Sequence, residues 1–244
     1  MSGAPWLFAR PQRWDDDTIR LSRAESHHAL RVLRLARGAS VCVTDGVGTV
    51  ALCKVRASDG GHVAAEVIER RHYARPSPEV VVYQGAAKGA KVDDVIERLA
   101  QLGVACVRVF LSERSVVRWD ARKSQALADR WSAIARSAAK QSRNPFMVAT
   151  GRPLPWTALT AELARSDDAL VLWEEAALPL RRALRDTARV DLVVGPEGGL
   201  TSREVEELED AGARLVSLGA RILRTENAPV VATAVILYHH GLIG

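Results

Sequence analysis

The sequence has few cysteines, and none of them forms a metal-binding or redox pattern. Cys42, Cys53 and Cys106 lie in apolar, strand-like contexts without a Cys-x-x-Cys pair, so we expect buried free thiols. The histidine pairs His27-His28 and His239-His240 have no carboxylate or cysteine at ligand spacing. The sequence therefore predicts no metal site.

Long apolar runs are also lacking. The opening MSGAPWLFARPQRW has no sustained apolar segment of the kind found in secretory signals, and no run in the chain reaches membrane-spanning length. At 244 residues, 48% hydrophobic and 26% charged, the chain can bury a core in one large domain or two modest ones. We expect a soluble cytoplasmic protein.

The glycine-rich stretches match neither of two common nucleotide-binding patterns. Gly195-Pro196-Glu197-Gly198-Gly199 lacks the Lys-Ser/Thr ending of a P-loop and does not follow GxGxxG. Neither a nucleoside triphosphate nor a dinucleotide is indicated. Backbone groups in such loops can instead hold an uncharged base or a thioether-bearing ligand.

Positive charge is present in excess and is unevenly distributed. The net charge is +5, residues 1–75 hold 12 Lys/Arg against 8 Asp/Glu, and residues 114–143 hold 8 against 2. Basic bands in an otherwise balanced protein indicate a polyanionic partner. A solvated helix face would explain one such cluster alone.

Residues 1–75 predict a small β-barrel domain. Strand patterns at 41–44 and 49–55 flank the turn Asp45-Gly46-Val47-Gly48, and residues 62–68 offer a third strand.

A helix is predicted before these strands, over residues 26–37. Arg31, Arg34 and Arg37 recur at three-residue spacing on one side of it. They could follow a phosphate backbone, or they could be ordinary surface arginines.

Arg75-Pro76-Ser77-Pro78 predicts a domain boundary, which divides the chain into residues 1–75 and 76–244. Beyond it, strands and helices alternate as in an α/β domain with right-handed crossovers. The predicted strands are residues 79–84, 104–111, 169–173, 190–194 and 214–218; the predicted helices are 91–102, 121–141, 157–164, the segment between Thr201 and Gly212, and 230–238.

Two glycine-punctuated loops each follow one of these buried-strand patterns. Residues 195–199 follow the strand at 190–194, and residues 219–227 follow the strand at 214–218. Ligands of open α/β sheets bind beyond the carboxyl ends of the strands, so the two loops predict a small-molecule pocket. Tight turns alone would explain either loop in isolation.

The motifs GPEGG and SLGARILRTENA, at this spacing, resemble the cofactor-binding loops of the SPOUT methyltransferases, and specifically of the 16S ribosomal RNA uridine-N3 methyltransferase family. The resemblance extends to HHALRVLRLARG, SERSVV and AAKQS. It implies an S-adenosyl-L-methionine site in a deep trefoil-knot α/β domain, a PUA-like RNA-binding domain at the N-terminus, and an obligate homodimer. The implied substrate is 16S ribosomal RNA in the small ribosomal subunit.

The resemblance also implies which residues bind the donor, with Ile222 and Leu223 packing on its adenine. The implied donor site consists of Leu172, Gly195, Pro196, Glu197, Gly198, Gly199, Leu218, Gly219, Ile222, Leu223, Asn227 and Ala228.

The chain departs from the family pattern twice. Trp173-Glu174-Glu175 stands where the family more often has a His-Pro-Glu-like sequence, which leaves the contacts of Trp173 open. Asn227, followed by Pro229, replaces the usual RTETA ending. Because Asn227 is polar and can cap a helix, we expect activity to survive.

The basic residues and the motifs near the implied substrate give candidate RNA contacts. Glu113 and Arg114 could equally pair across a strand end. The candidate RNA-binding residues are Arg31, Arg34, Lys88, Arg114, Arg136, Lys140, Gln141 and Arg143.

Methylation of uridine N3 requires removal of an imide proton, so a base or a stabilising cation is needed. Arg224 is the candidate cation, because arginine can donate two hydrogen bonds to a uracil carbonyl edge. Glu226 and Glu197 are the candidate bases. Glu226 is also expected in the first turn of a helix, where a carboxylate is stabilising for structural reasons alone.

Two other functions fit the same residues. One is a ribosome-binding protein on an inactive methyltransferase scaffold. The other is a phosphate-ester enzyme that uses the GPEGG amides as an anion nest.

Overall fold

The chain folds into two compact units. In the computed structural model, which describes residues 3–59 and 61–244, unit 1 comprises Met1–Arg75 with Ala139–Met147, and unit 2 comprises Pro76–Ala138 with Val148–Gly244. The division at Arg75 coincides with the proline-rich boundary in the sequence. Ala139–Met147 was predicted in the second domain, but its contacts are with the first.

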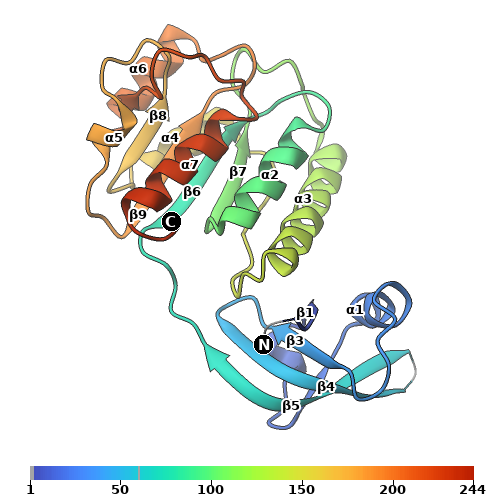
Figure 1. Ribbon diagram of the computed structural model, residues 1–244. Coiled ribbons are helices and arrows are strands. Elements are labelled where there is room, and N and C mark those ends of the chain that lie inside the picture. The colour runs from blue at the N-terminus through green and yellow to red at the C-terminus, as the bar shows by residue number, and fades with distance from the viewer. Residues whose placement is uncertain (1–2, 60) are drawn as a thin grey trace. The chain divides into compact units, whose positions relative to one another are not determined.

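Unit 1 is built on a five-stranded, mostly antiparallel sheet, in the order β1-β3-β4-β5-β2 (Figure 1). A 3-10 turn, η1 (Pro11–Arg13), joins its two short outer strands. The strands are β1 (Trp6–Phe8), β2 (Thr18–Arg20), β3 (Ser40–Thr44), β4 (Thr49–Asp59) and β5 (His62–His72).

The predicted hairpin is confirmed by the pairing of β3 with β4, whose register sets Val43 against Ala51. Its turn is held by Asp45, which accepts hydrogen bonds from the backbone of Val47 and Thr49 at 2.8 and 2.9 Å. The alternating inward side chains of the strands build a separate hydrophobic core in this unit.

The helix predicted over residues 26–37 is wrong in its bounds. Helix α1 runs over Arg23–His27, capped by Ser22, and continues as a π-helical turn, η2 (His28–Val32). Arg34 then adopts a left-handed backbone with φ of 53°. The apolar spacing was read correctly as helical, but it does not reveal the cap at Ser22 or the change of winding.

Ala139–Met147 belongs to unit 1 because its polar groups bond there. Lys140 Nζ donates to Glu25 Oε1 at 2.8 Å, and the two side chains are 15% and 9% exposed. Thr44 Oγ1 donates to the Pro145 carbonyl at 2.9 Å.

Unit 2 contains a parallel five-stranded sheet, in the order β10-β8-β9-β6-β7. The predicted strands over 104–111 and 214–218 are shorter in the structure. The strands are β6 (Glu79–Gly85), β7 (Cys106–Phe110), β8 (Ala169–Leu172), β9 (Arg189–Val194) and β10 (Arg214–Val216).

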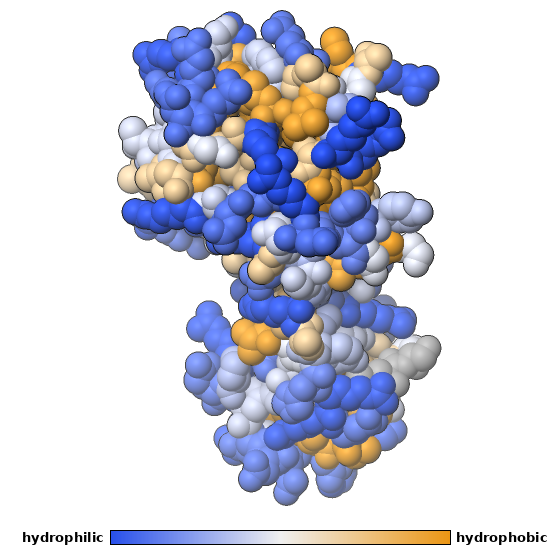
Figure 2. Space-filling view, turned by 90° about the vertical axis from the view of Figure 1, so that its left-hand side faces the viewer, coloured by the Kyte–Doolittle hydropathy of each residue, from blue (hydrophilic) through white to orange (hydrophobic). Residues whose placement is uncertain are grey.

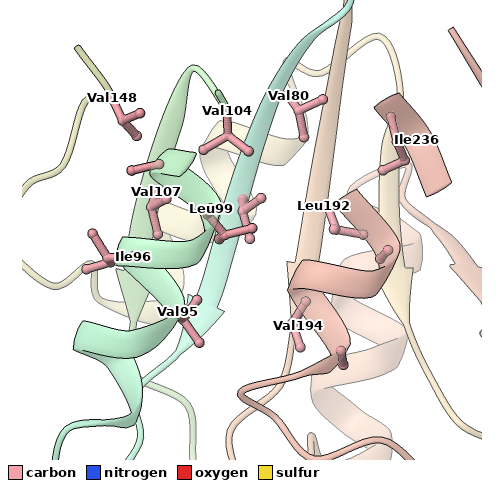
Figure 3. Close-up of a cluster of buried hydrophobic side chains, with 14 of the residues drawn as sticks. Val80, Val95, Ile96, Leu99, Val104, Val107, Val148, Leu192, Val194 and Ile236 are labelled. Atoms are coloured by element: carbon pink, nitrogen blue, oxygen red, sulfur yellow. The ribbon is translucent and has the colours of Figure 1, made fainter. Parts of the chain in front are cut away.

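Helices cover both faces of this sheet. On one face α2 and α7 lie side by side (Figure 1), and Val95, Ile96 and Leu99 of α2 pack toward the strand valines (Figure 3). The other face is covered by α4 and α6. The helices are α2 (Lys91–Leu102), α3 (Ala121–Gln141), α4 (Trp156–Leu163), α5 (Leu180–Ala183), α6 (Ser202–Asp210) and α7 (Ala228–His239).

The bounds of α2 and α3 are those predicted from apolar periodicity. Gly103, with φ of 82°, ends α2 in the left-handed conformation. The capping box predicted for α6 is confirmed, because Thr201 Oγ1 accepts from Glu204 N at 3.2 Å while Glu204 Oε2 accepts from Thr201 N at 2.8 Å. The trefoil knot stays a prediction.

Buried charge gathers near the amino ends of the parallel strands. Asp191, with a side chain 1% exposed, accepts from Arg189 Nη2 at 2.6 Å and from Ser166 Oγ at 2.5 Å. Asp168 is paired with Arg214, which also donates to the Ala183 carbonyl at 2.7 Å. These bonds connect the segment before β8 with β9 and with β10.

Candidate functional site

A cavity of about 350 Å³ opens at the carboxyl ends of β8, β9 and β10. Its walls come from three loops: the GPEGG loop (residues 195–200), the C-terminal loop (residues 217–227) and the corner Leu172-Trp173-Glu174. Its size is within the usual range for small-molecule sites. A small-molecule pocket is predicted at this edge of the sheet from the sequence.

The GPEGG loop is a compact turn. Gly199 N–H donates to the Pro196 carbonyl at 2.9 Å, and Gly199 has φ of 70°, a conformation that favours glycine. At Gly198, an added Cβ would lie 3.1 Å from the Arg114 carbonyl oxygen, so a side chain there would crowd the neighbouring segment. A side chain is therefore unfavourable at Gly198 because of crowding and at Gly199 because of the backbone conformation.

The C-terminal loop is joined to the GPEGG loop by one hydroxyl group. Thr225 Oγ1 donates to the Gly195 carbonyl at 2.7 Å and accepts from Gln84 Nε2 at 2.9 Å. Toward the cavity the loop presents Leu218, Leu223 and Ile222, and Ile222 is 85% exposed. The wall thus combines fixed backbone with accessible apolar side chains.

The corner after β8 forms the third wall, and it resolves where Trp173 lies. Trp173 lines the cavity, and its backbone N–H donates to the Val216 carbonyl at 3.0 Å. Leu172 and Glu174 line the cavity on either side of it. The departure from the family pattern therefore changes a residue in the wall of the site.

The SERS segment also reaches the cavity. The Arg114 guanidinium donates to the Leu200 carbonyl at 3.2 Å and to the Gly198 carbonyl at 3.4 Å. Glu113 N–H donates to Glu204 Oε1 at 2.7 Å. Both residues thus have the structural pairing considered as an alternative to RNA contact, although Arg114 remains exposed.

A charged cluster borders the cavity. Lys91 Nζ lies 2.8 Å from Glu197 Oε1 and 3.8 Å from Glu226 Oε2, and Arg224 Nη1 lies 4.0 Å from Glu226 Oε1. The hydrogen bond to Glu197 raises the pKa of Lys91. The three predicted catalytic residues are therefore close neighbours, but only Glu197 lines the cavity.

Glu226 does not lie in a helix, contrary to expectation, because α7 begins two residues later at Ala228. Its Oε2 atom is buried and has no hydrogen-bond partner, and its side chain is 17% exposed. The Arg224 side chain is 83% exposed.

All but one of the predicted donor-binding residues line this cavity. The exception is Asn227, whose Oδ1 accepts from Arg98 at 3.3 Å. Asn227 precedes α7 but makes no side-chain capping bond, so the expected cap is wrong. Lining residues that were not predicted for the donor are Arg114, Trp173, Glu174, Val194, Leu200, Val216, Ser217, Ala220, Arg221 and Thr225.

Most of those unpredicted residues are neighbours of predicted ones. Ser217, Ala220 and Arg221 lie within the SLGARILRTENA motif itself, so including every residue of that motif would have found them. Arg114 is different. It follows β7 in the sequence and reaches the cavity only through the fold, so no local sequence pattern shows that it lines the site.

The candidate RNA-binding residues fall in both units. The exposed candidates in unit 1 are Arg31, Arg34, Gln141 and Arg143. Lys140 is held in its ion pair with Glu25, which gives it a structural role. Lys88 and Arg114 are exposed in unit 2, and Arg136 is half-buried there.

Two kinds of feature are absent from the described residues, 3–59 and 61–244. In this part of the chain, no group of three His, Cys, Asp or Glu side chains could hold a metal ion. Within the same ranges, no helix has the length and apolar character needed to cross a membrane.

The fold and the site now define a class of protein. A family model described as an RNA methyltransferase domain matches residues 75–237, and one described as an RNA methyltransferase PUA domain matches residues 21–68. The chain belongs to this family of RNA methyltransferases.

Named relatives are similar over most of the chain. Ribosomal RNA small subunit methyltransferase E of Mycobacterium tuberculosis is 34% identical over 213 residues, which cover 85% of this chain and 81% of the relative. The protein of the same name from Bacillus subtilis is 30% identical over 235 residues, covering 93% and 92%.

A solved structure shares the fold. Ribosomal RNA small subunit methyltransferase E from Neisseria gonorrhoeae, crystallised with bound S-adenosyl methionine, superimposes with a TM-score of 0.86 at 25% identity. The superposition covers 97% of this chain and 98% of that one.

Proposed function

We propose that this protein transfers a methyl group from S-adenosyl-L-methionine to N3 of a uridine in 16S ribosomal RNA, with the cytoplasmic small ribosomal subunit as its substrate. The observation that carries the proposal is that the GPEGG loop, the C-terminal loop and the Leu172–Glu174 corner wall the same cavity. The names of the relatives support the choice of RNA.

The cavity has the chemistry to hold such a donor. S-adenosylmethionine supplies an electrophilic methyl group on a sulfonium centre. Backbone groups around Gly195 and Gly219 can hydrogen-bond an adenine edge, while Leu218, Ile222 and Leu223 offer apolar contact to its ring.

Three charged side chains are proposed to act on the uridine. The cation Arg224 stabilises negative charge as it develops on the imide, since its guanidinium is exposed and can donate two hydrogen bonds. Glu197 and Glu226 are the two candidates for proton acceptor. Glu197 lines the cavity, whereas Glu226 has an oxygen that no hydrogen bond occupies.

The proposed RNA surface includes the exposed arginines of unit 1. Arg31, Arg34 and Arg143 are exposed, so their guanidinium groups can contact phosphates. The PUA match over residues 21–68 supports this assignment. Lys140 is omitted from it, because using this residue for RNA would break the buried pair with Glu25.

A homodimer is proposed from the composition of α7. Its sequence, APVVATAVILYH, has no charged residue before the final histidine, and a helix that is apolar on all sides is normally buried. Yet Val231 is 41% and Tyr238 is 72% exposed, and apolar side chains gather on the surface of unit 2 (Figure 2). A second copy would cover them. Val231→Glu should shift the protein to monomer in analytical ultracentrifugation.

The test of the activity uses small ribosomal subunits that lack the modification. They are incubated with S-adenosylmethionine and the protein, and the digested RNA is analysed by mass spectrometry for N3-methyluridine. We expect the product with the unaltered protein, and its loss with Arg224→Ala or Gly198→Val. Glu197→Gln and Glu226→Gln identify the proton acceptor as the variant whose turnover falls far more than its donor affinity.

The alternatives predict other results. Donor binding without any methylated RNA would favour the ribosome-binding protein on an inactive scaffold. Competition by simple nucleotides, with no binding of S-adenosylhomocysteine, would favour the phosphate-ester enzyme.

A further inference from the structure

Taken together, three residues of β6 and the start of α2 contact the two cavity loops, although none of them lines the cavity. They are Gln84, Gly85 and Lys91, and we name them the clasp. None of the three was selected by the sequence motifs.

Gln84 is unusual for its place in the fold. It is 1% exposed near the end of β6, a central strand whose other side chains are mainly apolar. A buried amide is unfavourable unless it is hydrogen-bonded. Its Nε2 donates to Thr225 Oγ1 at 2.9 Å and to the Gly85 carbonyl at 3.0 Å, while its Oε1 has no partner.

The direction of this hydrogen-bond chain is fixed. The Gly195 carbonyl can only accept, so the Thr225 hydroxyl donates its one proton there, at 2.7 Å. Thr225 must therefore accept from Gln84, and only the amide nitrogen can donate. A glutamate or an apolar residue at position 84 cannot replace this link from β6 to the C-terminal loop.

Gly85 brings the β6 backbone against the GPEGG loop. A Cβ atom at Gly85 would lie 2.3 Å from Pro196 N and 2.7 Å from the Gly195 carbonyl carbon. Those atoms are backbone, so they cannot move aside as a flexible side chain would. Only glycine permits this approach.

Lys91 stands where a cation is unfavourable. It is the first residue of α2, and the preceding Ala90 provides no side-chain cap. Positive charge at a helix N-terminus opposes the helix dipole. Here it lies between two carboxylates, at 2.8 Å from Glu197 of one loop and 3.8 Å from Glu226 of the other.

We propose that Gln84, Gly85 and Lys91 are positioning residues that hold the GPEGG and C-terminal loops in register for donor binding. The inference rests on the proposed function for the identity of the ligand. Its structural part, the holding of the loops, does not require a ligand.

Hydrogen exchange of the unliganded protein tests the structural part. The reporters are the amides of Gly199 and Asn227, bonded to the Pro196 and Arg224 carbonyls at 2.9 and 2.8 Å. Gln84→Met removes the donor without leaving a cavity, and we expect exchange of both amides to rise about three- to tenfold. Lys91→Met should raise it about two- to fivefold, because that pair is partly exposed.

Calorimetric titration with S-adenosylhomocysteine tests the functional part. We expect affinity to fall by the same factors in Gln84→Met and Lys91→Met, and by at least about tenfold in Gly85→Ala, with the thermal midpoint nearly unchanged in the first two. Lys91→Arg keeps the cation and should restore affinity. The control is Lys123→Met, at an exposed lysine of α3 that does not line the cavity.

Each combination of exchange rate and donor affinity supports or overturns the proposal. Faster exchange with weaker binding supports the clasp, and unchanged exchange in both methionine variants overturns it. Faster exchange with unchanged affinity overturns its role in donor binding. If the unaltered protein fails to bind S-adenosylhomocysteine, the proposed function is wrong. The exchange rates of the unliganded protein then still show whether the clasp holds the loops.

Discussion

The two ends of the parallel sheet in unit 2 use polar residues in opposite ways. At the amino ends, Asp168 and Asp191 are almost fully buried and paired with arginines. At the carboxyl ends, glycine loops surround an open cavity, and the charged groups beside it are partly exposed. Charge at one end stabilises the fold, and space at the other end is available to a ligand.

The largest effect is expected at the amino end. Asp191→Ala removes the acceptor of Arg189 and Ser166 and should lower the free energy of unfolding by about 3 kcal/mol. Urea denaturation measures the loss. Asp167→Ala, at an exposed neighbour, is the control and should change stability by less than about 0.5 kcal/mol.

At the carboxyl ends of the strands, a substitution should change ligand affinity and leave stability nearly unchanged. Ile222→Glu alters a side chain that is 85% exposed, so the free energy of unfolding should stay within about 0.5 kcal/mol. Affinity for S-adenosylhomocysteine should fall about tenfold, because a charge replaces apolar contact in the cavity wall. Calorimetric titration measures the affinity. A large loss of stability with intact affinity would contradict the difference between the two ends of the sheet. The apolar control is Leu178→Glu, outside the cavity.

A smaller effect is expected in unit 1. Arg34 has a left-handed backbone, with φ of 53°, which glycine adopts more readily than arginine. Arg34→Gly should therefore leave stability unchanged or raise it by up to about 1 kcal/mol. RNA affinity should fall about three- to tenfold, and the salt dependence of binding should decrease by about one phosphate contact.

Filter binding at several salt concentrations measures this RNA affinity. Arg165→Gly removes an exposed arginine of unit 2 and is the control. Equal losses of affinity in the two variants would contradict a specific role for Arg34.

The last prediction concerns Cys106, the first residue of β7. Burial raises the pKa of its thiol from about 9 to about 11, against the opposing influence of Arg108. At pH 8 the thiolate is then about a hundredfold rarer than in the unfolded chain, and alkylation should be slower in proportion.

The raised pKa also fixes the sign of a pH effect on stability. The neutral thiol is favoured in the folded state, so its stabilisation is fully present below pH 9 and is lost as pH rises through about 11. Mass spectrometry of alkylated protein gives the rates, and Cys106→Ser should remove this part of the pH dependence.

The sequence predicted the long elements of unit 2 well. The bounds of α2 and α3 followed from apolar residues at helical spacing, and Thr201 with Glu204 predicted the start of α6. The short elements β1, β2 and α5 were missed, because segments of three or four residues show no periodicity. The two strands are determined by their pairing with β3 and β5.

The site was predictable to the extent that its motifs are local. Both glycine loops were found from strand ends and turn residues, and they meet at one cavity as parallel topology requires. Gln84 and Lys91 were missed because each is defined by a partner far along the chain, at Thr225 and at Glu197. Lys140 was taken for an RNA contact because composition does not reveal its pairing with Glu25.

The most direct test of the central claim is a calorimetric titration of the unaltered protein with S-adenosylhomocysteine, repeated with adenosine monophosphate. The account predicts one S-adenosylhomocysteine site per chain, lost in Gly198→Val and retained in folded Asp191→Ala, with no competition by the nucleotide. Binding of the nucleotide without S-adenosylhomocysteine, or equal binding by the Gly198 variant, would contradict the assignment of this cavity to the methyl donor.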